Sequence, residues 1–169
     1  MNSRPADQLT IAVAQLNPIV GDVRGNADKV RRAREQARNA DLIVFPELFI
    51  AGYPPEDLVL KPALQAACRA AIEALALETA DGGPAMLVGT PWVEADRLYN
   101  GVALLDRGRI AALRFKVDLP NYGVFDEKRV FAPGPMPGPI VFRGVRLGVP
   151  ICEDIWGPEP VECIADTGG

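Results

Sequence analysis

The chain has 169 residues, a length that suits a single domain with a sizeable hydrophobic core. Its net charge of −4 argues against nucleic-acid binding, and no apolar run approaches the roughly 18 residues of a membrane-spanning helix. It contains no histidine and a single serine, Ser3, so these residues exclude a Ser-His-Asp or Cys-His hydrolase. The three cysteines lack CxxC spacing, which excludes a disulfide framework, and no residues have the spacing of a metal site.

The N-terminal third is predicted to contain two strands and a helix. Residues 1–8 form a tail without the apolar core of a signal peptide, so we expect a soluble, cytoplasmic protein. Residues 9–16 predict a buried first strand, and residues 41–45 predict a central strand covered on both faces. Between them, the spacing of small apolar residues predicts a helix over 26–38, whose basic residues we interpret as a solvated face rather than an anion site.

The middle of the chain is predicted to contain a helix followed by three strands. The Ala- and Leu-rich residues 62–79 predict a long helix, in which Cys68 is an ordinary core residue. Strands are predicted over 85–93, 97–105 and 110–115, and an Asp-Arg-Gly-Arg turn joins the last two. This order of elements indicates an α/β domain.

The last third begins with a long polar and aromatic loop over residues 118–127. The Pro- and Gly-rich residues 132–139 are expected to be extended and nonhelical. A hairpin of residues 140–142 and 145–151 then leads directly into a cysteine, and a short helix is predicted over 159–165.

Three chemically active residues, Glu47, Lys116 and Cys152, each follow a predicted apolar strand. Functional groups of α/β sheets gather beyond the carboxyl ends of strands, so the three converge if their strands are neighbours. Glu47 would then accept the thiol proton, and Lys116 would stabilise the thiolate and the oxyanion formed on attack. Because Glu153 and Asp154 adjoin the thiol and are expected to raise its pKa, a nearby cation is a chemical need. Taken singly, each of the three is more often a solvated cap or a core residue.

Longer segments surround the same three residues. They are Phe45-Pro46-Glu47-Leu48-Phe49-Ile50-Ala51-Gly52-Tyr53, Lys116-Val117-Asp118-Leu119-Pro120 and Pro150-Ile151-Cys152-Glu153-Asp154-Ile155-Trp156. These segments resemble the glutamate, lysine and cysteine motifs of the nitrilase (carbon–nitrogen hydrolase) superfamily, and they occur in the family order. Two extensions, residues 52–58 and 119–127, are similar to the glutaminase domain of glutamine-dependent NAD+ synthetase.

The resemblance implies a nitrilase-like α-β-β-α sandwich of two mixed sheets flanked by helices. We expect residues 9–169 to form this domain incompletely, truncated at the C-terminus. The implied reaction is hydrolysis of the side-chain amide of L-glutamine to glutamate and ammonia, without a metal or organic cofactor. In the family, ammonia passes to a C-terminal synthetase domain that uses ATP and Mg; we expect this domain to be absent from the chain. A homo-oligomer is also implied.

The resemblance also assigns roles to six residues. Cys152 is the expected nucleophile, Glu47 the base and Lys116 the electrostatic partner. Substrate binding is assigned to the remaining three, which are Tyr122, Glu127 and Trp156. Tyr122 lies in the loop after the lysine, Glu127 corresponds to a second glutamate found near the lysine in many family members, and Trp156 lines the pocket or, equally, packs in the core.

Two other functions are compatible with the same residues. One is a stand-alone amidase or carbamoylase of this superfamily that acts on a small amide, although the two motif extensions argue against it. The other is a noncatalytic, truncated domain that serves only folding or assembly.

Overall fold

The computed structural model describes residues 8–169, so nearly all of the expected tail at residues 1–8 lies outside the described residues. A five-stranded sheet has the order β1 (Ile11–Val13), β2 (Leu42–Val44), β3 (Ala85–Glu94), β4 (Arg97–Asp106) and β5 (Arg109–Phe115). The first three strands are parallel and the last two pairings are antiparallel, so the sheet is mixed. The predicted strands over 41–45, 85–93, 97–105 and 110–115 are therefore confirmed.

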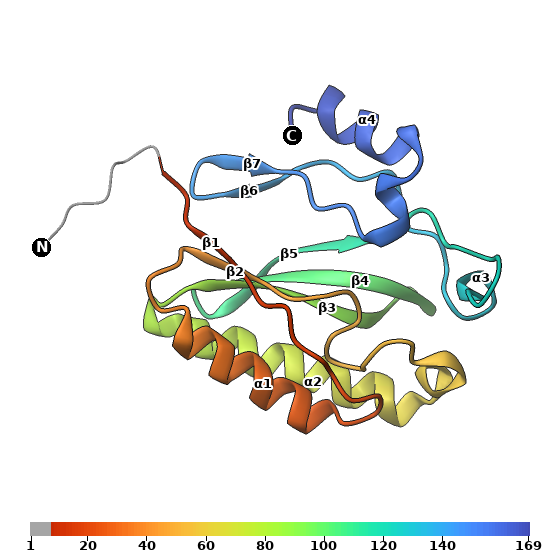
Figure 1. Ribbon diagram of the computed structural model, residues 1–169, viewed down its shortest axis with the longest axis horizontal. Helices are drawn as coiled ribbons and strands as arrows, with labels where there is room; N and C mark the ends of the chain where they lie inside the picture. Colours follow the sequence, from red (N-terminus) through yellow and green to blue (C-terminus); the bar gives the residue numbers. More distant parts are fainter. Residues whose placement is uncertain (1–7) are drawn as a thin grey trace, which may run out of the picture.

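Two long helices, α1 (Val23–Gln36) and α2 (Pro62–Glu78), cover one face of this sheet (Figure 1). Their apolar faces and the sheet enclose the largest of three hydrophobic clusters among residues 8–169. Cys68 is fully buried in it, as predicted. Helix α1 begins earlier than the predicted residue 26, because the Asp22 carboxylate accepts a hydrogen bond from the Gly25 N–H and caps the helix there.

The opposite face of the sheet is covered by a hairpin of β6 (Ile140–Phe142) and β7 (Val145–Leu147), with helix α4 (Pro158–Asp166) beyond it (Figure 1). Apolar side chains between the hairpin and the sheet form the second core. The layers therefore run helix, sheet, sheet, helix, which confirms the expected α-β-β-α architecture. Within residues 8–169 the second sheet consists of the antiparallel pair β6–β7.

The remaining elements are short. Helix α3 (Glu127–Val130) follows the long loop, and 3-10 turns occupy Glu56–Leu60, Thr79–Asp81 and Cys152–Ile155. The residues over 132–139 form no regular structure, as expected from their Pro and Gly content.

Two strand predictions differ from the structure. The first strand is an edge strand rather than a buried one: β1 pairs with β2 only, and Ile11 and Val13 are 46% and 76% exposed. Alternation turns Ala12 toward the helices and these two residues toward the less covered face. The strand predicted over 145–151 ends at Leu147. A Cβ on Gly148 would lie 2.8 Å from Ile164 Cγ2, so packing of α4, rather than strand pairing, decides the course of the chain there.

The basic side chains of α1 are paired rather than simply solvated. The Arg31 guanidinium contacts Glu78 at 2.8 Å, and Arg34 makes two hydrogen bonds to Asp81, at 2.6 and 2.9 Å. Both acidic partners lie at the end of α2 and just after it, so these ion pairs join the two helices.

Gly89 in β3 allows the segment that carries Glu47 to cross directly over the sheet. A Cβ at this position would lie 2.4 Å from the Pro46 carbonyl oxygen and 2.5 Å from Leu48 N. The segment is fixed on both sides of this crossing, because Phe45 N donates to Leu87 O at 2.9 Å and Ile50 N donates to Gly89 O at 3.1 Å.

We therefore expect Gly89→Ala to lower the free energy of unfolding by about 1–3 kcal/mol, the usual effect of overpacking a close contact. Urea unfolding followed by circular dichroism measures it. Gly138→Ala is the matched control, since its Cβ would meet only Thr167 Oγ1, at an ordinary 3.9 Å. Equal stability of the two variants would contradict the close crossing.

Candidate active site

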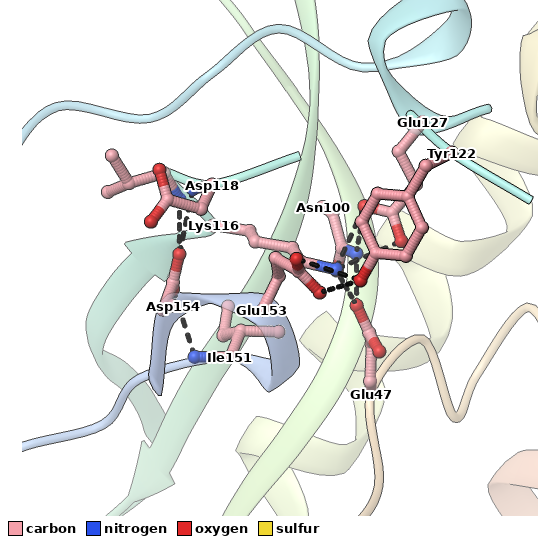
Figure 2. A network of polar contacts seen from close by, with 10 residues as sticks. Glu47, Asn100, Lys116, Asp118, Tyr122, Glu127, Ile151, Glu153 and Asp154 are labelled. Carbon is pink, nitrogen blue, oxygen red and sulfur yellow. Dashed lines mark hydrogen bonds and ion pairs between the residues drawn. The ribbon is translucent and has the colours of Figure 1, made fainter. Parts of the chain in front are cut away.

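Lys116, Glu47 and Cys152 come together, but not because their strands are neighbours. Glu47 follows β2 and Lys116 follows β5, and β3 and β4 separate these strands in the sheet. Cys152 follows β7, which belongs to the other layer. The long side chain of Lys116 spans the gap by crossing β4 toward Glu47 (Figure 2). Its start is fixed, because Lys116 N donates to Asn100 O at 2.8 Å and extends the β4–β5 ladder.

The Lys116 ammonium is fully buried between two carboxylates. Its Nζ lies 2.7 Å from Glu47 Oε1, and 2.9 and 3.0 Å from the two oxygens of Glu127. The Asn100 side-chain amide donates to Glu47 Oε1 at 2.7 Å (Figure 2). A buried charge is tolerated only when it is paired and hydrogen-bonded, and both conditions hold for Lys116.

Burial and neighbouring charges act in opposite directions on these groups. Burial acts to lower the pKa of Lys116, but Glu47 and Glu127 together raise it above its ordinary value, so the ammonium form persists. Burial raises the pKa of Glu127, although Lys116 opposes this change. With both carboxylates ionised, the cluster has one positive and two negative charges.

Cys152 opens the 3-10 turn with a φ of 47°, in the left-handed region that residues other than glycine rarely adopt. Together with Glu47 it lines a cavity of about 120 Å³ between the two layers. Burial raises the pKa of the Cys152 thiol, the charge of Glu47 and a hydrogen bond to its carboxylate raise it further, and Lys116 acts to lower it. The resting thiol is therefore protonated, with a carboxylate ready to take its proton.

The two acidic neighbours of Cys152, which were expected to raise the pKa of the thiol, make hydrogen bonds elsewhere. Glu153 accepts a hydrogen bond from the Tyr122 hydroxyl at 3.0 Å. Asp154 is buried; its Oδ1 accepts from the N–H groups of Val117 and Asp118 at 3.0 and 2.8 Å, and its Oδ2 accepts from Ile151 N at 3.0 Å (Figure 2). Asp154 thus joins the cysteine turn to the residues that directly follow Lys116.

A cleft of about 790 Å³ lies beside this site. Its walls include Tyr122, Glu153 and Trp156, together with residues 117–121. Trp156 is 78% exposed, so core packing, the alternative considered for it, is wrong. Glu127, expected among the substrate-binding residues, lies instead against Lys116 and is largely buried.

Sequence reasoning missed three residues of this site. Asn100 is a lone amide in the apolar strand β4, a signal that could have been noticed. Asp154 was noted only for its charge. Tyr53 lines a pocket together with Glu127, and burial, followed by the charges of Glu47 and Glu127, raises the pKa of its phenol to about 12.

The described part of the chain contains no group of three or more His, Cys, Asp or Glu side chains that could hold a metal ion. Across residues 8–169, none of the helices is both long enough and apolar enough to cross a membrane.

The chain was compared with known proteins and structures. A family model described as carbon-nitrogen hydrolase matches residues 10–168. The glutamine-dependent NAD(+) synthetase of Rhodobacter capsulatus is 43% identical over 164 residues, which are 96% of this chain and 30% of that protein. This chain therefore spans about 30% of the length of that relative.

Solved structures agree with this finding. The glutamine-dependent NAD+ synthetase of Acinetobacter baumannii superposes with a TM-score of 0.85 at 38% identity, covering 91% of this chain and 29% of that one. An amidase from Nesterenkonia also gives a TM-score of 0.85, at 28% identity, covering all of this chain and 65% of that one. In the structure of a glutamate-to-glutamine mutant of the amidase from Nesterenkonia sp. AN1, at 29% identity and a TM-score of 0.81, acrylamide has undergone Michael addition at the active-site cysteine. Fold, motif order and family match agree, and the chain belongs to the carbon-nitrogen hydrolase family.

Proposed function

We propose that this chain is the glutamine-hydrolysing part of a glutamine-dependent NAD+ synthetase and supplies ammonia for NAD biosynthesis. The observation that carries the proposal is the cluster of Cys152, Glu47 and Lys116, in which one carboxylate contacts a buried ammonium and lines the same small cavity as the thiol. Curated relatives at 42–44% identity with this name support the choice of glutamine over other amides.

In the first half of the reaction, Glu47 accepts the Cys152 proton and the thiolate attacks the carbon of the glutamine side-chain amide. Lys116 and a backbone N–H near Cys152 stabilise the negative oxygen of the tetrahedral intermediate. The C–N bond then breaks as Glu47 returns the proton to the nitrogen. Ammonia leaves, and a γ-glutamyl thioester remains on the sulfur.

In the second half, water attacks the thioester while Glu47 takes one of its protons. The C–S bond breaks, the sulfur regains a proton from Glu47, and glutamate is released. Glu127 keeps Lys116 charged throughout, because it supplies the second carboxylate around the buried ammonium. None of these steps requires a metal or an organic cofactor.

The cleft beside the cluster is where glutamine would bind. Tyr122 and Trp156 line it, and the Tyr122 hydroxyl is held by Glu153. The carboxylate of Glu153 would suit the positively charged α-amino group of an amino acid. Trp156 offers a large apolar surface against the substrate's methylene groups.

The same proposal covers the partners of the chain. Ammonia would pass to a C-terminal synthetase domain, a ligase that binds ATP and Mg. The protein would act in the cytoplasm as a homo-oligomer.

The proposal is tested by measuring kcat/KM for glutamine and for propionamide with the protein that contains this chain. We expect glutamine to be strongly preferred, with ammonia and glutamate released in equal amounts. Faster hydrolysis of propionamide would favour a stand-alone amidase. No hydrolysis of either amide, together with no labelling of Cys152 by a glutamine-analogue electrophile, would indicate a noncatalytic domain.

A further inference from the structure

Asn100 is a buried amide whose nitrogen is hydrogen-bonded and whose oxygen, within the described residues, is not. The side chain is fully buried in the middle of the sheet. Its Nδ2 donates to Glu47 Oε1 at 2.7 Å and approaches Glu127 Oε2 at 3.5 Å. Its Oδ1 has no hydrogen-bond partner among residues 8–169. Buried polar atoms are normally paired, so a half-satisfied amide at this position points to a function of its N–H groups.

The orientation of the amide follows from its surroundings. Two carboxylates face one end of the side chain, and carboxylates accept hydrogen bonds but do not donate them when ionised. A flipped amide would place its oxygen against Glu47 and Glu127 and repel both. The NH₂ group must therefore face the carboxylates, and the oxygen is left without a partner.

Asn100 and Lys116 donate to the same oxygen of Glu47. Lys116 Nζ and Asn100 Nδ2 both lie 2.7 Å from Oε1, and neither bonds to Oε2 (Figure 2). Two donors, one of them charged, occupy the oxygen that they share. The second oxygen receives neither bond and is the one free to accept a proton from the thiol.

We propose that Asn100 is a positioning residue that makes Glu47 Oε2 the oxygen that accepts the Cys152 proton. This inference rests on the proposed function, in which Glu47 is the general base. Lys116 alone does not select the oxygen, because its ammonium has three equivalent donors and divides them between Glu47 and Glu127. Asn100 adds a second donor from a fixed direction, on a strand that also holds the Lys116 backbone.

The first test is Asn100→Leu, which keeps the branching at Cγ and removes the donor. We expect kcat for glutamine to fall about 100-fold, the effect of misplacing a reacting group by about 1 Å, while KM changes little. In a Glu47→Gln background, Asn100→Leu should cause no further loss, because it acts only through that carboxylate. Thr90→Val is the matched control: it removes a buried polar group from the adjacent strand, and kcat should stay at the parental value.

The second test is Asn100→Asp, which keeps the shape of the side chain. It remains informative if the leucine variant fails to fold. An ionised Asp cannot donate to Glu47, whereas a protonated Asp can. The activity of this variant relative to the parent should therefore rise as the pH is lowered, a response that a merely structural residue would not show.

Different results would contradict the role of Asn100 and the role of Glu47. Unchanged kcat in Asn100→Leu, a relative activity of Asn100→Asp that does not depend on pH, or an equal loss in the Glu47→Gln background would overturn the role of Asn100 alone. Full turnover in the Glu47→Gln variant itself would overturn the role of Glu47 as the general base, whereas failure of the parent protein to hydrolyse glutamine would overturn the proposed function.

Discussion

Cys152→Ala is expected to abolish release of ammonia from glutamine, with kcat lower by about 10⁴-fold or more, as for the loss of other catalytic nucleophiles. The chain has no histidine and its single serine lies at position 3, and neither Cys68, which is fully buried, nor Cys163 lines the cavity with Glu47, so no other thiol is placed to form the covalent intermediate. In a protein that also carries a synthetase domain, NAD+ formation from added ammonia should continue at the parental rate.

Cys163→Ala is the control for this substitution, because Cys163 is a half-buried thiol on α4. It should hydrolyse glutamine at the parental rate. The measurement is coupled detection of glutamate, with ammonia-dependent synthesis measured in parallel. Glutamine-dependent turnover that survives in Cys152→Ala would show that the nucleophile lies elsewhere.

Glu47→Gln is expected to have two effects of opposite sign. Hydrolysis should fall about 10²- to 10⁴-fold, since the general base and the proton donor to the leaving ammonia are both lost. Alkylation of Cys152 by acrylamide should nevertheless become faster at neutral pH. Next to burial, the charge of Glu47 is the largest cause of the raised pKa of this thiol, so its removal increases the fraction of thiolate.

The direction in which each charge shifts the pKa of Cys152 can be measured from the pH profile of alkylation. In the parent protein the pKa of Cys152 is raised above its ordinary value, so the alkylation rate should still increase with pH where an ordinary thiol is already ionised. Glu47→Gln should move the profile to lower pH, and Lys116→Met should move it to higher pH, because Lys116 acts to lower the same pKa. Mass spectrometry after timed exposure gives the rates. Shifts in the same direction would contradict the charge arrangement described above.

Local sequence patterns were sufficient for most of the fold. The apolar strands β2 to β5 and the Ala-rich helix α2 are recognisable because each is bounded by turn signals or by Pro and Gly. The strand predicted over 145–151 was wrong because its outcome depends on a distant contact, between Gly148 and Ile164. The exposure of β1 likewise depends on which elements cover an edge, and periodicity carries no such information.

The site likewise contains residues that could be predicted from the sequence and contacts that could not. Glu47, Lys116 and Cys152 stand out because strand ends and motif order mark them. The route by which they meet was not predictable, since it depends on the reach of one lysine side chain across β4. Asn100 bonds to Glu47 and Asp154 bonds to Asp118, and the residues of each pair lie at least 36 positions apart in the sequence. No local sequence pattern indicates such pairs.

The three hydrogen bonds of Asp154 have a mechanical consequence. Two of them, from the N–H groups of Val117 and Asp118, bridge the two layers of the sandwich, and the third, from Ile151 N, holds the carboxylate within the cysteine turn. Sliding of one layer over the other would break charge-assisted bonds in a water-poor interior, which is unfavourable. Relative motion of the two layers is therefore expected to change the distance between the Cys152 sulfur and the Lys116 ammonium very little.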